Sequence, residues 1–181
     1  MKGIIFTEFM ELVEQKFGPE SLETILEQAK DQGVYTAVGS YDHKALVKLI
    51  VVLSQLTNIP PEELQRVFGH SIFKNLYQSL PKSASLHECK NTFQFIRLVE
   101  DYIHLEVKKL YSDANPPKFE FISETETELV FDYVSARCMA HVCLGLVEGC
   151  AEYFGQSVEI FMDKQTDVGN QVRFSLQLVD A

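Results

Sequence analysis

Three side chains that donate hydrogen bonds alternate along one short stretch of the sequence: Tyr133, Ser135 and Arg137. Alternate residues of an extended segment point to one face, so an extended conformation here would bring the phenol, the hydroxyl and the guanidinium together. Such a set suits paired carboxylates, because arginine binds a carboxylate through two parallel hydrogen bonds. Haem is an intracellular ligand that carries two carboxylates and whose iron takes an axial histidine. His104, on a predicted helix, is the candidate for that histidine.

The helical period gives His104 a different place. The stretch from Ser85 to Tyr111 is the longest helical candidate, and it is apolar along two lines, as a substantially buried helix would be. His104 falls on the remaining stripe, with Arg97, Asp101 and Lys108. Periodicity alone therefore favours a solvent-exposed histidine. A ligand histidine also needs an acceptor for its second ring nitrogen, and the sequence does not identify one.

The spacing of these residues resembles the haem–nitric oxide/oxygen binding family, called H-NOX, which includes the sensor domain of soluble guanylate cyclase. The resemblance rests on His104, on Pro117 thirteen residues later, and on the Tyr-x-Ser-x-Arg triplet at 133–137. It extends to Met-Lys-Gly-Ile-Ile at 1–5 and Leu-Gly-Leu-Val-Glu-Gly at 144–149, and it covers nearly the whole chain. The triplet alone is a weak pattern, but the combination is specific. It implies a bacterial stand-alone member of the family, and it reverses the preference for an exposed His104.

The resemblance also implies roles for individual residues. His104 would ligate the iron of haem b (iron protoporphyrin IX), and Pro117 would press on the same face of the porphyrin. The triplet Tyr133, Ser135 and Arg137 would hold the propionates. The residues that would line the opposite, gas-binding side are Ile5, Phe9, Leu76, Val142 and Leu146.

Val142 bears on which gas would bind. Oxygen-binding members of the family carry a tyrosine at this position, whose hydroxyl stabilises bound dioxygen, whereas valine has no hydrogen-bond donor. All five of the gas-side residues are apolar. Because nitric oxide and carbon monoxide bind ferrous haem without a donor, the resemblance implies a nitric oxide sensor that also binds carbon monoxide and excludes oxygen.

Enzymatic activity has little support in the sequence, which lacks a Gly-rich phosphate loop, a nucleophile elbow and a His-Glu-x-x-His element. We therefore expect no catalytic residues. The resemblance implies a sensor that regulates a separate protein, either a histidine kinase or an enzyme of cyclic-di-GMP synthesis or degradation. The alternative is a haem-free signalling or scaffold domain on the same fold. A haem peroxidase is a weaker alternative, because the gas side has no group to donate a proton.

Composition limits the partners. The 181 residues carry a formal net charge of −10, which disfavours nucleic acid and anionic membranes and is compatible with a basic partner surface. No membrane-spanning run or signal peptide is evident, so we expect a cytoplasmic protein. No Cys-x-x-Cys pair occurs, and reduced thiols are expected for Cys89, Cys138, Cys143 and Cys150. The remaining histidines, expected at the surface, are His43, His70, His87 and His141.

The order of the elements predicts one α+β domain over 1–181. Helices are expected at 1–17, 21–32, 42–56 and from Pro61, with a break at Gly69-His70, and then the long helix. A small antiparallel sheet of about four strands should follow, with one helix packed on it. Its strands are expected at 118–123, 128–133, 157–162 and 171–179, and its helix at 136–154. The subdomains would be 1–64 and 65–181, with haem between the two parts.

Overall fold

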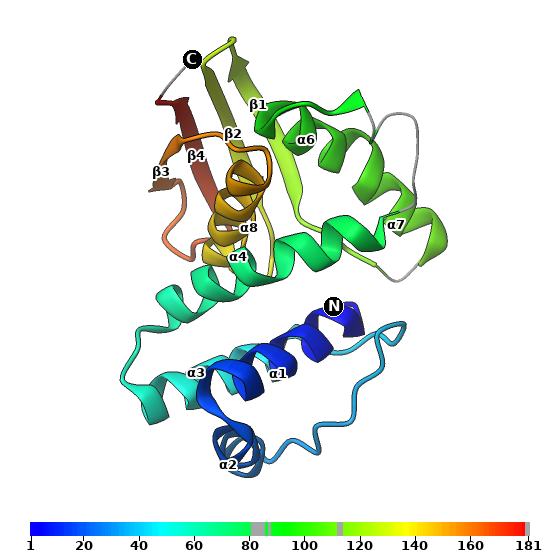
Figure 1. Cartoon of the computed structure of the whole chain (residues 1–181), viewed down its shortest axis with the longest axis vertical. Coiled ribbons are helices and arrows are strands. Elements are labelled where there is room, and N and C mark those ends of the chain that lie inside the picture. The colour runs from blue at the N-terminus through cyan, green and yellow to red at the C-terminus, as the bar shows by residue number, and fades with distance from the viewer. Residues whose placement is uncertain (81–85, 87, 112–113, 180–181) are drawn as a thin grey trace. The chain divides into compact units, whose positions relative to one another are not determined.

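The computed structural model describes residues 1–80, 86, 88–111 and 114–179 (Figure 1). It has helices followed by a four-stranded antiparallel sheet, so the predicted α+β class is confirmed. The chain divides into two compact units, Met1–Phe68 and Gly69–Ala181. Among the described residues, no helix combines the length and the apolar character that crossing a membrane requires.

The first unit is helical. Its helices are α1 (Gly3–Phe17), α2 (Pro19–Ala29), α3 (His43–Thr57) and the first part of α4 (Pro61–Ser79). Gly18, at φ 86°, ends α1, and Pro19 then starts α2, where its missing N–H costs nothing. As predicted, Asp42 caps α3, and its carboxylate accepts the Lys44 N–H at 3.0 Å. The largest fully buried side chains of this unit are Phe6, Phe9, Ile25, Leu46, Leu49, Ile50, Leu53 and Phe68.

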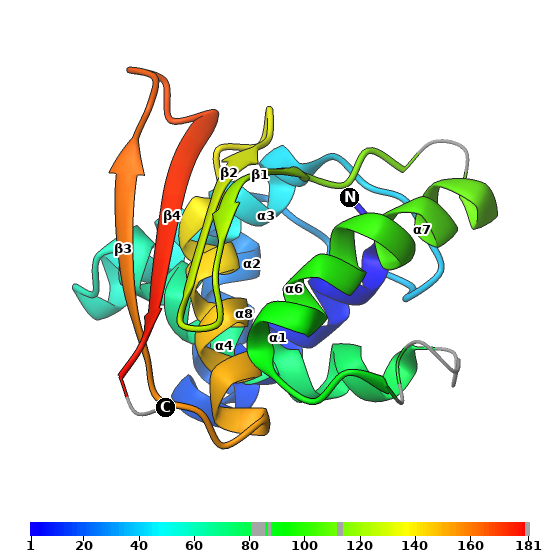
Figure 2. The same ribbon diagram turned by 90° about the horizontal axis from the view of Figure 1, so that it is seen from above.

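The second unit is built on the sheet, whose strand order is β1-β2-β4-β3. The strands are β1 (Lys118–Glu124), β2 (Glu128–Val134), β3 (Val158–Lys164) and β4 (Gln171–Leu178). Apolar side chains alternate along β2 and β4 and form a core with α6 (Thr92–Leu98) and α8 (Ala140–Tyr153). Figure 2 shows α8 along this face of the sheet. The buried sheet residues in that core are Leu129, Phe131, Tyr133, Val172, Phe174 and Leu176.

The predicted break at Gly69-His70 is wrong, because α4 is continuous from Pro61 to Ser79. Gly69 serves a close helix crossing instead. A Cβ atom at Gly69 would lie 2.1 Å from the Val142 carbonyl oxygen of α8, and one at Gly149 would lie 2.8 Å from the Phe73 Cβ of α4. Only glycine allows the two backbones to approach this closely.

The predicted long helix is not α-helical throughout. After α6 comes a π-helical segment, η1 (Val99–Ile103), and then α7 (His104–Leu110). The His104 N–H donates to the Val99 carbonyl, five residues back. Ser85, where the helix was expected to start, and His87 lie outside the described residues. The helix predicted at 136–154 begins only at Ala140, because the chain first makes a turn.

Candidate functional site

His104 is mostly buried, and its side chain is only 12% exposed. The exposed position that the helical period favoured is therefore wrong. The reason lies in η1, which directly precedes His104. A π-turn holds one more residue than an α-turn, so the residues after it are rotated about the helix axis relative to an α-helical count. His104 is consequently turned away from the line of Arg97, and Lys108, one turn later on α7, turns with it.

Glu100 supplies the acceptor that the sequence did not reveal. Its Oε2 lies 2.9 Å from the Nδ1 of His104 and accepts the backbone N–H of Phe119 at 3.0 Å. The edge of the Phe119 ring packs against the imidazole, with the ring centroids 5.4 Å apart. Because a carboxylate only accepts, Nδ1 carries the hydrogen and Nε2 keeps its lone pair. The spacing of four residues on one helix was the available signal, but many such pairs are simple surface contacts.

The protonation of His104 also suits a metal ligand. Burial lowers the pKa of His104, and the hydrogen bond that His104 donates to Glu100 only partly opposes that shift. The neutral imidazole is the form that binds a metal. Pro117 directly precedes β1 and lies two residues before Phe119, so it belongs to the segment that packs beside His104.

The triplet Tyr133, Ser135 and Arg137 does not lie on one extended segment, so the condition under which the three side chains would alternate on one face is not met. β2 ends at Val134, and a turn follows in which the Cys138 N–H donates to the Ser135 carbonyl at 3.2 Å. Cys138 itself has a φ of 54°, in the left-handed region. The turn is anchored because the Ser135 N–H donates to the Asn170 carbonyl at 2.8 Å.

The turn nevertheless brings the three donors together. Tyr133 is buried, and burial raises its pKa to about 12, while a hydrogen bond with Ser135 and the charge of Arg137 act to lower it. Ser135 is also buried, and its Oγ accepts the Arg137 backbone N–H at 3.2 Å. Arg137 is half-buried. A phenol and a hydroxyl thus meet at one end of β2, and the charge of the Arg137 guanidinium acts on the phenol.

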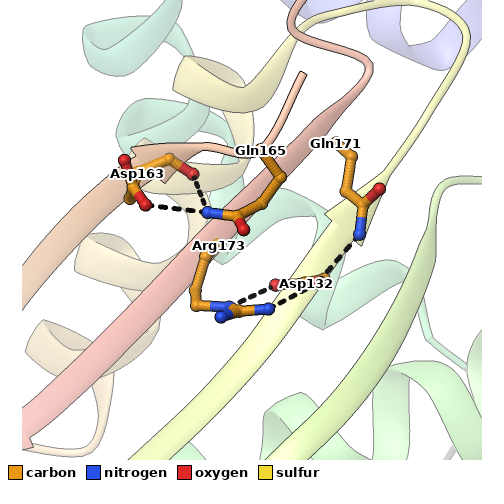
Figure 3. Close-up of polar contacts among 5 residues, drawn as sticks. All are labelled: Asp132, Asp163, Gln165, Gln171 and Arg173. Carbon is orange, nitrogen blue, oxygen red and sulfur yellow. Dashed lines mark hydrogen bonds and ion pairs between the residues drawn. The ribbon is translucent and has the colours of Figure 1, made fainter.

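A polar network on the other face of the sheet holds this end of β2 (Figure 3). Asp132, the residue before Tyr133, accepts bonds from Arg173 Nε at 2.8 Å and Nη2 at 3.1 Å, and from Gln171 Nε2 at 2.9 Å. The hydrogen bond from Arg173 holds the pKa of Asp132 below its ordinary value. Because Arg173 and Gln171 lie on β4, the network ties β2 to β4 where the turn begins. Sequence reasoning missed it, since it depends on strand register.

The predicted gas-side residues fall in both units, and each group is described within its own unit. Leu76 on α4, and Val142 and Leu146 on α8, belong to the second unit and are half-buried. Val142 and Leu146 lie at the close crossing of α8 with Gly69. Ile5 and Phe9 lie on α1 in the first unit, where the Phe9 ring meets Phe68 edge-on, with the centroids 5.3 Å apart.

The other histidines have different surroundings. His70 is exposed and forms an ion pair with Glu152, with 2.7 Å between Nε2 and Oε2. His43 lies beside Asp42 at the start of α3, and His141 is half-buried on α8. The four cysteines are free thiols, as predicted.

The donor set fits haem. A neutral imidazole with a free Nε2 suits the iron, and the donors at the end of β2 suit two propionates. His104, Tyr133, Ser135 and Arg137 would therefore hold the group. The geometry and the chemistry of these four side chains agree with the resemblance that the sequence carries.

Comparison with known proteins identifies the family. A family model described as Haem-NO-binding matches residues 2–162. The comparison with curated proteins gave no significant match. Among solved structures, the unliganded Fe(II) H-NOX protein from K. algicida has 35% sequence identity and a TM-score of 0.92, over 100% of this chain and 98% of that chain.

Two further structures have other ligation states. The Fe(II)CO H-NOX from Shewanella woodyi, bound to IWP-051, has 38% identity and a TM-score of 0.81 over 98% of this chain and 94% of that chain. The Fe(II)NO H-NOX protein from S. oneidensis has 26% identity and a TM-score of 0.87 over 99% of this chain and 100% of that chain. The chain therefore belongs to the Haem-NO-binding (H-NOX) family of gas-sensing haem domains.

Proposed function

We propose that this protein senses nitric oxide at a ferrous haem b ligated by His104. The observation that best supports this proposal is the pairing of His104 Nδ1 with Glu100 at 2.9 Å, which fixes the ring and leaves Nε2 for the iron. Ferrous haem would supply the atom that binds the gas. His104 would hold the iron, and Pro117, from the segment that packs beside His104, would contact the porphyrin on the same side.

The propionates would be held by the donors at the end of β2. Arg137 would contribute most, since its hydrogen bonds to a carboxylate are charge-assisted and bidentate. Tyr133 and Ser135 would each donate a single hydrogen bond through a neutral hydroxyl.

The apolar residues on the gas-binding side of the haem would determine which gas binds. Val142 has no donor with which to stabilise bound dioxygen, and Ile5, Phe9, Leu76 and Leu146 have none either. We therefore expect nitric oxide and carbon monoxide to bind and a stable oxygen complex to be excluded. Related H-NOX structures in Fe(II)NO and Fe(II)CO states agree with this choice of ligands.

The response would pass to a separate signalling protein, either a histidine kinase or an enzyme of cyclic-di-GMP synthesis or degradation. Glu100 bonds both His104 and the Phe119 N–H, so a displacement of His104 would act on the start of β1 through two hydrogen bonds. Such a displacement regulates a partner only if the partner binds the two arrangements with different affinity.

The test is a visible spectrum of the purified protein, before and after nitric oxide. His104→Gly should abolish the five-coordinate ferrous spectrum, and added imidazole should restore it. His70→Gly is the matched control, because His70 is exposed and pairs with Glu152, and it should leave the spectrum unchanged. A wild-type spectrum in His104→Gly would refute the assignment, and a protein without a Soret band would favour the haem-free alternative.

A further inference from the structure

The face of the sheet that points away from the α8 core is here called the outer face. Strand register arranges them in rows across the sheet. In one row, Gln177 of β4 pairs with Glu159 of β3 and with Glu128 of β2. Two residues further along the strands, a second row consists of Phe161, Ser175, Val130 and Ser123. A third row consists of Asp163, Arg173, Asp132 and Glu120.

The first and third rows are acidic. Together they contain five carboxylates and one cation, Arg173, whose Nε and Nη2 bond Asp132. Figure 3 shows this guanidinium directed at Asp132, while the Asp163 carboxylate meets the amide of Gln165. Lys118 neutralises Glu120, with 2.6 Å between Nζ and Oε1. In the part of the chain that the structure describes, no ion pair includes Glu128 or Glu159.

The middle row is apolar or small, and it contains one prominent side chain. Phe161 is 64% exposed, although it is a large aromatic residue on a regular strand. Its neighbour across the strands is the small Ser175, followed by the half-buried Val130. The middle row thus presents an exposed aromatic ring beside smaller side chains. The rows on both sides of it carry carboxylates. Exposed aromatic residues of this kind are enriched at protein interfaces.

We propose that the outer face is the docking surface for a basic region of a partner protein, in which an apolar side chain lies between Lys or Arg residues. The apolar side chain would pack on Phe161 over Ser175, and the flanking cations would meet Glu128, Glu159 and Asp163. This proposal names the chemistry of the regulated protein, and so it rests on the proposed function.

Charge decides between the possible occupants. The phosphates of nucleic acids and the headgroups of anionic lipids are repelled by the acidic rows. A second copy of this chain would bring the same carboxylates opposite one another, which is unfavourable. A basic protein surface is the occupant that complements both the rows and the net charge of −10.

The same strands carry the candidate haem site and the outer face. Tyr133 lies on the core side of β2, and Asp132, the residue before it, lies on the outer side. Strand β1 contributes Glu120, the last residue of the third row. The neighbouring Phe119 N–H of β1 donates a hydrogen bond to Glu100. A displacement at His104 therefore reaches a strand that forms part of the docking surface.

The probe is a fluorescent synthetic helical peptide made of Leu and Lys, with a control peptide in which Glu replaces every Lys. Fluorescence anisotropy with the ferrous haem-loaded protein should detect binding of the Lys peptide and none of the Glu peptide. The affinity should fall as salt rises, because the screening length shrinks from about 8 Å at 0.15 M to about 3 Å at 1 M. Equal binding of both peptides would overturn the proposal.

The variants locate the binding surface. The double variant Glu128→Lys/Glu159→Lys should weaken binding on the order of tenfold, because two attractions become repulsions. Glu23→Lys/Glu27→Lys on α2 is the matched control, because it changes the net charge equally at two exposed positions. Phe161→Ser should also weaken binding, whereas Val34→Ser, at a 73% exposed valine of the first unit, should not. Equal weakening by the outer-face and control variants would refute the assignment.

Two readouts separate this proposal from its alternatives. Sedimentation measures whether the wild type forms a dimer. A dimer that is lost in Phe161→Ser would show that the outer face binds a second copy of this chain, and it would overturn the proposal. Visible spectra with nitric oxide test the proposed function separately. A normal nitric oxide spectrum with no effect of the outer-face variants on peptide binding would refute the docking surface alone.

Discussion

Replacing Glu100 by Gln or Ala changes the surroundings of His104 without touching the imidazole. In the wild type, one carboxylate oxygen accepts from both His104 Nδ1, at 2.9 Å, and the Phe119 N–H, at 3.0 Å. Glu100→Gln keeps an acceptor oxygen and removes its charge. Glu100→Ala removes the acceptor and leaves both donors without this partner.

The size of the effect follows from the burial of the pair, whose side chains are 12% and 20% exposed. Hydrogen bonds to a charged group contribute about 1.5–3 kcal/mol, and leaving a buried donor unpaired costs about 1–3 kcal/mol. Partners of a ligand histidine alter metal affinity about 10–100-fold. We expect the loss of haem affinity to be near the lower end of that range for Glu100→Gln and near the upper end for Glu100→Ala.

Transfer of haem to an acceptor protein measures retention, and resonance Raman spectroscopy of the ferrous protein measures the iron–histidine bond. Both variants should lose haem faster, and the iron–histidine stretch should move to lower frequency because a less basic imidazole binds more weakly. Amide exchange at Phe119 gives a readout in haem-free protein, and Glu100→Ala should accelerate it. Glu106→Gln on α7, where Glu106 pairs with Lys109 at 2.7 Å, is the control.

The reasoning is refuted if Glu100→Ala retains haem at the wild-type rate with an unchanged iron–histidine stretch. Slow exchange at Phe119 in the same variant would show that Glu100 does not hold β1. If the control Glu106→Gln loses haem as fast as Glu100→Gln, the effect belongs to charge on the helix and not to the bond with His104.

Other changes have distinct expected outcomes. Arg137→Ala should reduce haem occupancy more than Ser135→Ala, and equal occupancies would contradict the ranking. Val142→Tyr should give a stable oxygen complex by visible spectroscopy, whereas the wild type in air should oxidise or stay unligated. Pro117→Ala should flatten the haem and move partner activity without gas toward the nitric oxide-bound level. Asp132→Asn should lower the free energy of unfolding by about 1–2 kcal/mol at neutral pH. Because the pKa of Asp132 is depressed in the folded protein, its stabilising effect is present above the ordinary value of 3.8. Chemical denaturation should therefore show the difference shrinking as pH falls below that value.

Much of the fold could be predicted because it follows from local patterns. No helix continues through the proline pair at 116–117, since α7 already ends at Leu110, and alternating apolar residues mark β2 and β4. Asp42 caps its helix as its residue type suggests. The close helix contact that Gly69 makes in place of the predicted break was not predictable, because the approach of α4 to α8 is a property of tertiary packing.

The site was predictable in its residue types and less so in its geometry. A turn after Val134 takes the place of the extended conformation considered for 133–137, and it is anchored by the bond from the Ser135 N–H to the Asn170 carbonyl, which joins distant parts of the sequence. The burial of His104 depends on η1, for which the sequence has no periodic signal, since a single π-turn is too short to set a pattern. Family resemblance supplied the assignment that periodicity opposed.

The π-turn makes the direction of His104 depend on how many residues one turn of this helix contains. A hydrogen bond that spans five residues encloses one residue more than the bond of an α-helix, so deletion of one residue between Val99 and Ile103 would allow the ladder to close in the regular way. His104 would then keep nearly its present direction relative to α6, because the π-turn already places it about where a chain one residue shorter would. Winding the same residues as regular α-turns, without a deletion, would instead turn His104 by up to about 100° relative to α6 and away from Phe119. The extra residue that η1 contains therefore sets the direction in which His104 points.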